Sequence, residues 1–356
     1  MKALVKYGKC PGIKCLDVEK PQIKKNEVLI RIYAAAICGT DMDYYEWGEV
    51  AKTFTKGKNI TFPFTIGHEC AGIIVEVGEE VKERKVGDRV AVEPHIPCCE
   101  CYLCKTNNKH NCLNMRVFGI DVNGGFAEYA VVDAIATYKI PDYISFSQAA
   151  LLEPAGVSMN AIDQSDIHST DIALVNGCGP IGLLLILLLR SKGITNIIAV
   201  DRNENKLQKA KELGAYTVNL YKEGFEEEVK EKSKAHAGVD VVFETSGSCK
   251  AYPFVFDIAR KEGKIITIGH PKEKIEVDIM RNINTKGLMI KGIFGRRIWD
   301  SWNHLAQMIQ EKGIDLADIV SEKYHIDDFE KAFKNAKTNW GKTVFEMEIA
   351  NEGTEN

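Results

Sequence analysis

The 356-residue sequence lacks any hydrophobic run long enough to cross a membrane. Its longest apolar stretch, residues 180–189, falls short of the roughly 20 residues that a spanning helix needs. The N-terminal residues also lack the extended apolar core of a signal peptide. These absences predict a cytosolic (cytoplasmic) protein with no membrane partner.

Basic side chains are not in excess either, because 46 Lys and Arg residues stand against 50 Asp and Glu residues. The formal net charge is −4 and the sequence pI is about 6.1. A balance of this kind gives no general attraction to phosphate backbones or anionic lipid. We therefore expect no nucleic-acid partner.

The cysteine content does not suit a complete disulfide framework, because the total of eleven is odd. Five of the eleven fall within residues 98–112. In a large chain predicted to be cytosolic, such a cluster is typical of metal binding or catalysis.

At 356 residues the chain is longer than most single domains, since a hydrophobic core stops growing at about 250–300 residues. We therefore expect two domains. Short apolar runs broken by glycine, proline and charge predict an all-β region over residues 1–153. Those runs are residues 27–33, 71–77, 88–92 and 126–132.

From residue 171 onward, strand and helix patterns alternate, which predicts an α/β fold with a doubly wound parallel sheet. The predicted strands are residues 172–175, 196–200, 239–243, 264–268 and 288–294, and the predicted helices are 180–192, 203–213, 225–235 and 250–260. A further helix carries Trp302, Leu305, Ala306 and Ile309 on one face, before a final strand at 342–347. We expect this C-terminal part to pack on the β region.

A glycine-rich turn lies between the first predicted strand and helix of this second part. It comprises Gly177, Gly179, Pro180, Ile181 and Gly182, and Asp201 ends the next predicted strand. This arrangement is typical of dinucleotide binding, where the pyrophosphate meets the helix N-terminus and the acid binds the ribose hydroxyls. Asp201 would repel a 2′-phosphate and favours NAD, whereas the nearby Arg202 and Lys206 leave NADP as the weaker alternative.

Four of the clustered cysteines have the spacing C-x2-C-x2-C-x7-C, at Cys98, Cys101, Cys104 and Cys112. Four thiolates in one short loop can close a tetrahedral shell around zinc, which predicts a structural Zn2+ site. An iron–sulfur centre is the weaker alternative. Cys99 lies between the first two cysteines, and its side chain is expected to point elsewhere.

A second group of metal-ligand residue types is spread along the β region. Cys38, His68 and Glu69 would form a mixed sulfur, nitrogen and oxygen set suited to zinc, with one position open for substrate or water. Glu153 adds a carboxylate where the two parts of the chain meet. Taken singly, each residue could instead be an ordinary core or surface residue.

Together these motifs resemble those of the zinc-dependent medium-chain alcohol and polyol dehydrogenases. The likeness covers nearly the whole chain and rests on residues 38–41, 67–69, 86–90, the cysteine loop, 124–129, 153–154 and 177–182. It implies a GroES-like β-rich catalytic domain, residues 1–154 completed by 296–356, and a Rossmann NAD-binding domain, residues 155–295. It also implies one catalytic and one structural zinc per subunit, an active site in the cleft separating the domains, and homodimers or homotetramers formed through Rossmann edge strands.

Within this family, residues 95–98, 290–297 and 299–302 are most similar to the threonine 3-dehydrogenases. Two positions depart from that group, because Asp43 and Asn160 stand where it carries histidine. Both residues suit hydrogen bonding to hydroxyls, so a polyol, sugar or cyclitol dehydrogenase is the alternative. A further alternative is a catalytically silent NAD-binding structural or sensor protein. Such a protein would be expected to lack Cys38, His68 or Thr40, and the sequence has all three.

The resemblance implies oxidation of a secondary alcohol of a small polar substrate, with hydride transfer to NAD. Zinc would lower the pKa of the substrate hydroxyl, and Thr40 would be the first hydroxyl of a proton relay. Asp43 would accept the proton, form a salt bridge or contact the substrate. Glu153 would be a fourth or alternating zinc ligand, or would orient another ligand.

Overall fold

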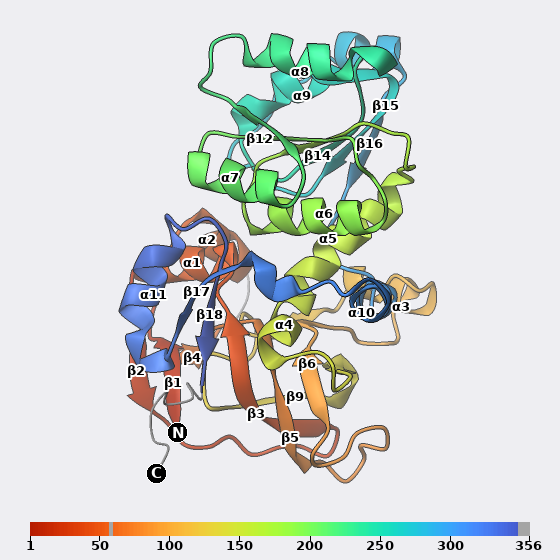
Figure 1. Ribbon diagram of the computed structural model, residues 1–356. Coiled ribbons are helices and arrows are strands. Elements are labelled where there is room, and N and C mark those ends of the chain that lie inside the picture. The colour runs from red at the N-terminus through yellow and green to blue at the C-terminus, as the bar shows by residue number, and fades with distance from the viewer. Residues whose placement is uncertain (57–59, 348–356) are drawn as a thin grey trace, which may run out of the picture. The chain divides into compact units, whose positions relative to one another are not determined.

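The computed structural model describes residues 1–56 and 60–347, and these divide into two compact units (Figure 1). The first, here called the β-rich unit, comprises Met1–Glu153 and the chain from Arg297. The second, the parallel-sheet unit, comprises Pro154–Arg296. Within residues 1–56 and 60–347, no helix combines the length and apolar character needed to cross a membrane.

The β-rich unit is organised around β3 (Glu27–Ala36), whose ten residues are mostly buried. The main sheet has the order β10-β6-β5-β3-β18-β17, and β9 also pairs with β3. Its other strands are β5 (Glu69–Val77), β6 (Arg89–Val92), β9 (Tyr129–Asp133), β10 (Thr137–Lys139), β17 (Val320–Tyr324) and β18 (Lys342–Glu346). The apolar residues of β3 therefore form the centre of this unit's core.

The C-terminal segment completes this unit. In Figure 1 the blue strand β18 lies beside the red β3, and the two pair antiparallel, with Phe345 opposite Ala35. The Phe345 ring lies 5.2 Å from that of Phe126 and 6.4 Å from that of Phe333. Because β18 fills a central position in the sheet, the unit cannot form its core without the last part of the chain.

Smaller elements surround the main sheet of the β-rich unit. The strands are β1 (Lys2–Lys6), β2 (Lys14–Asp17), β4 (Phe64–Thr65), β7 (His95–Ile96) and β8 (Arg116–Val117). The helices are α1 (Gly39–Glu46), α2 (Glu49–Thr55), α3 (Tyr102–Lys105), α4 (Phe146–Ala150), α10 (Asp300–Lys312) and α11 (Phe329–Ala336).

The expectation of an all-β region over residues 1–153 is wrong for the segment that forms α1 and α2. Carboxylates at the helix starts explain the difference. Asp41 accepts a hydrogen bond from the Cys38 backbone N–H at the start of α1, and Asp43 accepts one from the Ala51 N–H in the first turn of α2. These side chains satisfy N–H groups that a helix leaves without partners, so two short helices form in a segment without a regular apolar period.

The parallel-sheet unit contains six strands in the order β13-β12-β11-β14-β15-β16, and all neighbouring pairs are parallel. The strands are β11 (Ala173–Asn176), β12 (Ile197–Asp201), β13 (Tyr216–Asn219), β14 (Val239–Glu244), β15 (Ala259–Thr267) and β16 (Met289–Gly292). The helices are α5 (Leu152–Ser165), α6 (Pro180–Ser191), α7 (Glu204–Glu212), α8 (Phe225–Ser233) and α9 (Tyr252–Ile258).

This arrangement confirms the predicted doubly wound sheet. Figure 1 shows α6 and α7 on one face of the sheet and α8 and α9 on the other. Numbered in chain order, the strands run 3-2-1-4-5-6, the order of dinucleotide-binding folds. The direction of winding reverses between β11 and β14, and ligands of such folds bind at the carboxyl ends of the strands at that point.

Two details of this unit differ from the sequence-based expectation. The four-residue strand β13 was not expected, since only one of its residues is fully buried. Strand β15 begins at Ala259, five residues before the predicted start at 264, because Ala259 already pairs with Val239 ahead of an irregularity in the register. The chain thus passes directly from α9 into β15.

Candidate metal and cofactor sites

Three side chains from two neighbouring strands meet in the β-rich unit. Cys38 follows the end of β3 and directly precedes α1, while His68 and Glu69 stand at the start of β5. The antiparallel register sets Glu69 opposite Ala36, which brings the three residues to the same end of the sheet. One potential ligand atom from each lies within 4.8 Å of the others.

Asp41 holds two members of this group, and sequence reasoning did not single it out. Its Oδ2 accepts the Cys38 N–H at 2.9 Å, and its Oδ1 lies 3.2 Å from Nδ1 of His68. Burial lowers the pKa of His68, but the Asp41 carboxylate and the Cys38 thiol outweigh this and raise that pKa well above its usual value. Because Asp41 faces Nδ1, the imidazole Nε2 is the nitrogen left for a metal. The signal in the sequence was an acid three residues after the residue that caps α1.

Lys342 holds the third member. Its Nζ lies 2.5 Å and 2.6 Å from the two carboxylate oxygens of Glu69, and it also donates to the Ile37 carbonyl at 3.2 Å. Both side chains of the pair are almost fully buried. Burial lowers the pKa of Lys342, but Glu69 outweighs it and raises that pKa above its usual value. No local pattern could have found this contact, because the two residues are 273 positions apart.

The remaining acid, Glu153, acts on this group through its charge. Burial raises the pKa of Glu69 to about 7, and the Glu153 carboxylate adds to the rise in spite of Lys342. Among the described residues, Glu153 is not in the group whose ligand atoms converge. A divalent cation would offset the negative charge collected here, and thiolate, imidazole and carboxylate are the ligands that zinc takes. The donor set therefore fits zinc.

Thr40 and Asp43 both lie on α1 but differ in their surroundings. Thr40 is half-buried in the first turn, two residues after Cys38. Asp43 is buried, and its Oδ2 accepts the Ala51 N–H at 2.7 Å. A Cβ at Gly48 would come within 2.3 Å of Asp43 Oδ1, so this carboxylate packs closely against the start of α2.

The four spaced cysteines also converge, with their sulfur atoms all within 4.8 Å of one another. Sγ of Cys101 lies 3.5 Å from that of Cys104 and 3.9 Å from that of Cys112. A tetrahedral site with Zn–S bonds of about 2.3 Å requires sulfur separations of about 3.8 Å, so the geometry fits zinc. Cys99 is exposed, and its Sγ instead lies near the Pro97 carbonyl, as expected.

The charge state of this cluster also suits a cation. Backbone N–H groups of Glu100 and Cys101 lower the pKa of Cys98 to about 6, whereas burial raises the pKa of Cys104 to about 12. Without a bound cation, the buried thiol would keep its proton. A metal ion would stabilise all four residues as thiolates.

In the parallel-sheet unit, the glycine turn joins β11 to α6. A Cβ at Gly177 would come within 2.9 Å of the Ser246 nitrogen, and one at Gly182 within 1.9 Å of the Gly177 carbonyl oxygen. At Gly179, which caps α6, a Cβ would meet nothing within 4 Å. Space is therefore open at the helix N-terminus, where a pyrophosphate would be expected, with Pro180 and Ile181 in the first turn behind it.

Asp201 is fixed at the end of β12 by the backbone of the same turn. Its Oδ2 accepts the Cys178 N–H at 2.7 Å, and its Oδ1 accepts the N–H groups of Arg202 at 2.7 Å and Asn203 at 2.9 Å. The Arg202 side chain is exposed, and Lys206 uses its backbone N–H to bond the Asn203 side chain. The turn thus presents a rigid carboxylate beside an open helix N-terminus, which fits a dinucleotide.

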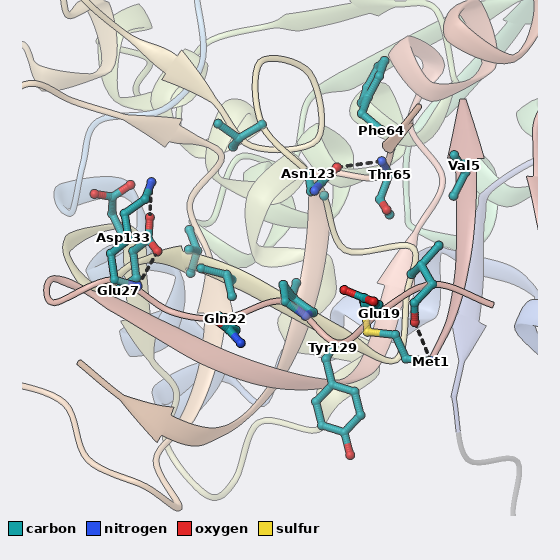
Figure 2. A pocket seen from close by; sticks show the side chains of 18 of the residues that line it. Met1, Val5, Glu19, Gln22, Glu27, Phe64, Thr65, Asn123, Tyr129 and Asp133 are labelled. Carbon is teal, nitrogen blue, oxygen red and sulfur yellow. Dashed lines mark hydrogen bonds and ion pairs between the residues drawn. The ribbon is translucent and has the colours of Figure 1, made fainter. Parts of the chain in front are cut away.

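A separate cavity of about 400 Å3 opens in the β-rich unit, and Figure 2 shows its lining. None of the candidate site residues lines it. Two of its three acids are paired: Glu27 accepts the Lys24 N–H, and Asp133 binds Asn26 and Arg116. The Thr65 N–H donates to Asn123 across the cavity wall. Because it contains none of the converging ligand or glycine-turn residues, this cavity is not the candidate active site.

Comparison with known proteins agrees with these sites. Residues 24–142 match the family described as "Alcohol dehydrogenase GroES-like domain", and residues 180–311 match "Zinc-binding dehydrogenase". L-threonine 3-dehydrogenase of Shewanella putrefaciens is 38% identical over 334 residues, covering 94% of this chain and 95% of the relative. The chain belongs to the zinc-dependent medium-chain dehydrogenase family. The enzyme of the same name from Pseudoalteromonas translucida is 37% identical to this dehydrogenase, with the same coverage.

Solved structures support the same assignment. The 2R,3R-butanediol dehydrogenase of Bacillus subtilis matches with a TM-score of 0.86 and 31% identity, over 98% of this chain and 99% of that one. An alcohol dehydrogenase of Escherichia coli, solved with NADH, matches with a TM-score of 0.87 and 26% identity over the same shares. The predictions of family, fold class and enzyme class are confirmed. The dehydrogenase is a zinc-dependent alcohol oxidoreductase that uses a nicotinamide dinucleotide.

Proposed function

We propose that the dehydrogenase oxidises the secondary alcohol of a small polar substrate with NAD, in the manner of L-threonine 3-dehydrogenase. The observation that carries the proposal is the convergence of Cys38, which is half-buried, with the buried His68 and Glu69. Two kinds of relative support it, since the threonine and butanediol dehydrogenases both act on secondary alcohols by their names.

In this proposal Cys38, His68 and Glu69 hold the catalytic zinc, and Glu153 serves as a fourth or alternating ligand or orients another ligand. The chemistry supplied there by zinc and NAD is Lewis-acid polarisation of a hydroxyl and acceptance of a hydride. Asp41 keeps His68 oriented, and Lys342 lowers the pKa of Glu69 against the rise that burial causes. Thr40 Oγ1 takes the proton from the substrate hydroxyl and passes it outward.

The direct test replaces Cys38 with alanine. Cys38→Ala should abolish alcohol-dependent NAD reduction while leaving the affinity for NADH unchanged, because the glycine turn lies in the other unit. Cys70→Ala is a suitable control, since Cys70 is a fully buried thiol one residue after Glu69. Turnover that persists in the metal-free Cys38→Ala protein would contradict the proposed zinc site.

We further propose NAD rather than NADP as the cofactor, bound by Gly177, Gly179, Pro180, Ile181, Gly182 and Asp201. The Asp201 carboxylate would repel a 2′-phosphate. Arg202 and Lys206 lie beside it and are the residues to exchange if NADP supports comparable turnover. The cysteine loop is proposed to hold a second, structural zinc, so metal analysis should find two zinc ions per subunit.

The second candidate function keeps the chemistry but changes the substrate to a polyol, sugar or cyclitol. Asp43 and Asn160 favour it, since they replace two histidines expected of a threonine dehydrogenase. The Asn160 amide donates to the Gly295 carbonyl at 3.1 Å, so this side chain is held in place by the backbone. NAD-reduction rates with L-threonine, amino alcohols, polyols, sugars and cyclitols would separate the two candidates, and no turnover with any of them would favour a silent role.

We also propose a homodimer formed through β16, with a tetramer as the alternative. β16 ends the six-stranded sheet, and all four of its residues are exposed. Met289 and Ile290 are 55% and 42% exposed, and Met280 nearby in the chain is 68% exposed. An apolar open edge of this kind pairs readily with a second copy. Ile290→Lys should shift the mass measured by light scattering toward the monomer.

The domain roles follow the same proposal. The β-rich unit would be the GroES-like catalytic domain, and the parallel-sheet unit the NAD-binding domain. A small-molecule alcohol is the expected partner, and location in the cytoplasm stays a prediction.

A further inference from the structure

The glycine turn of the parallel-sheet unit packs on a second loop, residues 244–247, at the carboxyl end of β14. β14 is the direct neighbour of β11, and the parallel register sets Glu244 opposite Asn176. The loop therefore stands at the point where the direction of winding reverses. Its sequence, Glu-Thr-Ser-Gly, was not singled out by any motif.

Thr245 bonds the turn directly. Its Oγ1 lies 2.7 Å from the Gly177 carbonyl oxygen and 3.1 Å from that of Asn176. The same Gly177 carbonyl would lie 1.9 Å from a Cβ at Gly182, so it reaches the first turn of α6. The Thr245 hydroxyl thus holds the Gly177 carbonyl, and this carbonyl sets how closely the glycine turn approaches α6.

Glu244 holds the loop in place beneath the turn. Its carboxylate is fully buried and accepts the Asn176 side-chain amide at 3.2 Å, the Ser246 N–H at 2.9 Å and the Gly247 N–H at 3.3 Å, and it also bonds the Ser246 hydroxyl. Every donor comes from either the end of β11 or the loop itself. A buried carboxylate with several donors is rigid, because losing any donor would leave negative charge unsatisfied.

Packing agrees with these hydrogen bonds. Gly177 has a φ of +102°, and a Cβ there would come within 2.9 Å of both Thr245 Oγ1 and the Ser246 nitrogen. The first glycine of the turn is therefore required by contact with the 244–247 loop. Gly179, where a Cβ would meet open space, is the position left for the cofactor.

We propose that Thr245 and Glu244 are positioning residues for the dinucleotide: they hold the Gly177 carbonyl, and with it the glycine turn, in the conformation that binds pyrophosphate. This inference rests on the proposed NAD site at the turn. Neither side chain needs to touch the cofactor, since both act through Gly177 and Asn176. Preorganisation of this kind lowers the cost of binding.

The test measures NADH affinity by calorimetry on the full-length, zinc-loaded enzyme, together with KM for NAD and kcat. Thr245→Val removes the hydroxyl while keeping the shape of the side chain. It should weaken NADH binding and raise KM for NAD by about tenfold, the usual effect of one lost buried hydrogen bond, with kcat at saturating NAD within about twofold of wild type. Thr245→Ser keeps the hydroxyl and should restore most of the affinity.

Ser233→Ala is the matched control. Ser233 is fully buried on α8 and donates to the Val229 carbonyl at 2.8 Å, so its loss also removes one buried hydroxyl bond from this unit. It should lower thermal stability without changing NADH affinity. Glu244→Gln is a second, independent variant, which keeps the inference testable if Thr245→Val fails to fold. It keeps the size of the side chain but places an amide where the Gly247 N–H donates, and it should weaken NADH binding.

Two outcomes would overturn this inference and leave the proposed NAD site intact. One is wild-type affinity for NADH in Thr245→Val, and the other is an equal loss of NADH affinity in Thr245→Val and Ser233→Ala. Absence of NADH binding by the wild-type enzyme would instead overturn the proposed NAD site, and the inference with it.

Discussion

The buried pair of Lys342 and Glu69 shows how one side chain far along the chain decides the state of a metal ligand. Lys342 contributes charge and two short contacts to a carboxylate that burial would otherwise neutralise. The Asp41 carboxylate does the same for His68, whose Nδ1 lies 3.2 Å away. The ligands are thus held by oppositely charged neighbours before any metal arrives.

Removal of Lys342 should therefore be costly. Lys342→Met leaves the Glu69 carboxylate buried without its partner, and breaking a buried ion pair in this way costs about 3–5 kcal/mol in the free energy of unfolding. Urea unfolding of the metal-free protein would measure it, because bound zinc would itself offset the Glu69 charge. The control is Lys323→Met, because Lys323 pairs with Glu346 at 2.7 Å with half of its side chain exposed. Its loss should cost less than about 1 kcal/mol, and equal costs for the two variants would contradict the role given to Lys342.

At the scale of elements, α1 and α2 depend on capping carboxylates more than on apolar periodicity. Asp43 is bonded to the backbone of α2, and the sequence-based roles of proton acceptor, salt-bridge residue or substrate contact stay predictions. Mutation can separate this capping contact from those predictions.

Asp43→Ala should destabilise the protein by about 1–2 kcal/mol, the usual loss when a helix cap is removed. Asp43→Asn keeps an oxygen that can accept the Ala51 N–H, so it should retain most of the stability and most of the turnover. Denaturant unfolding and kcat on the same preparations would check both. Lost turnover in a stable Asp43→Asn protein would instead support the proton-relay prediction.

The cysteine loop is a second element whose order should depend on a metal. Cys101→Ser removes one sulfur from the converging set, so the protein should lose one zinc per subunit and some thermal stability. Cys99→Ser is the matched control, because Cys99 lies in the same loop but its sulfur points away. Metal analysis and calorimetry would compare them. Zinc content equal to wild type in Cys101→Ser would contradict the structural site.

At the scale of the whole molecule, Asp240 ties β14 to the residue before β11 and to the start of β15. It accepts the Ile172 N–H at 2.8 Å and the Arg260 Nε–H at 2.6 Å, and it lies 2.6 Å from His236 Nδ1. Burial would raise the pKa of Asp240, but these hydrogen bonds outweigh it and hold the pKa below its usual value.

The lowered pKa of Asp240 determines how the free energy of unfolding changes with pH. A carboxyl with a lower pKa in the folded state stabilises the protein above its unfolded pKa of about 3.9, and this contribution is lost as pH falls through the folded pKa. Asp240→Asn should lower the free energy of unfolding by about 2–3 kcal/mol at pH 7 and by less at pH 3. Urea titrations at the two values would measure it, and an equal loss at both would show that the charge of Asp240 is not responsible.

The sites that spacing alone could predict are those whose residues are close in sequence, whereas Cys38, His68 and Glu69 were grouped by residue type and by resemblance to a family. The glycine turn and the cysteine loop each occupy fewer than about twenty consecutive residues, so spacing alone constrains their geometry. Alternation of strand and helix likewise predicted the doubly wound sheet. Asp41 was within reach of the same reasoning, since it lies three residues after Cys38.

What the sequence by itself determined was local: the nucleotide turn, the four-cysteine loop and the order of βαβ units. Only the tertiary structure decided that Lys342 meets Glu69, that Thr245 holds Gly177 and that β18 enters the sheet beside β3. These contacts join residues 68 to about 300 positions apart. Spacing along the chain carries no information about such pairs, because burial and strand register set them once the whole core has packed.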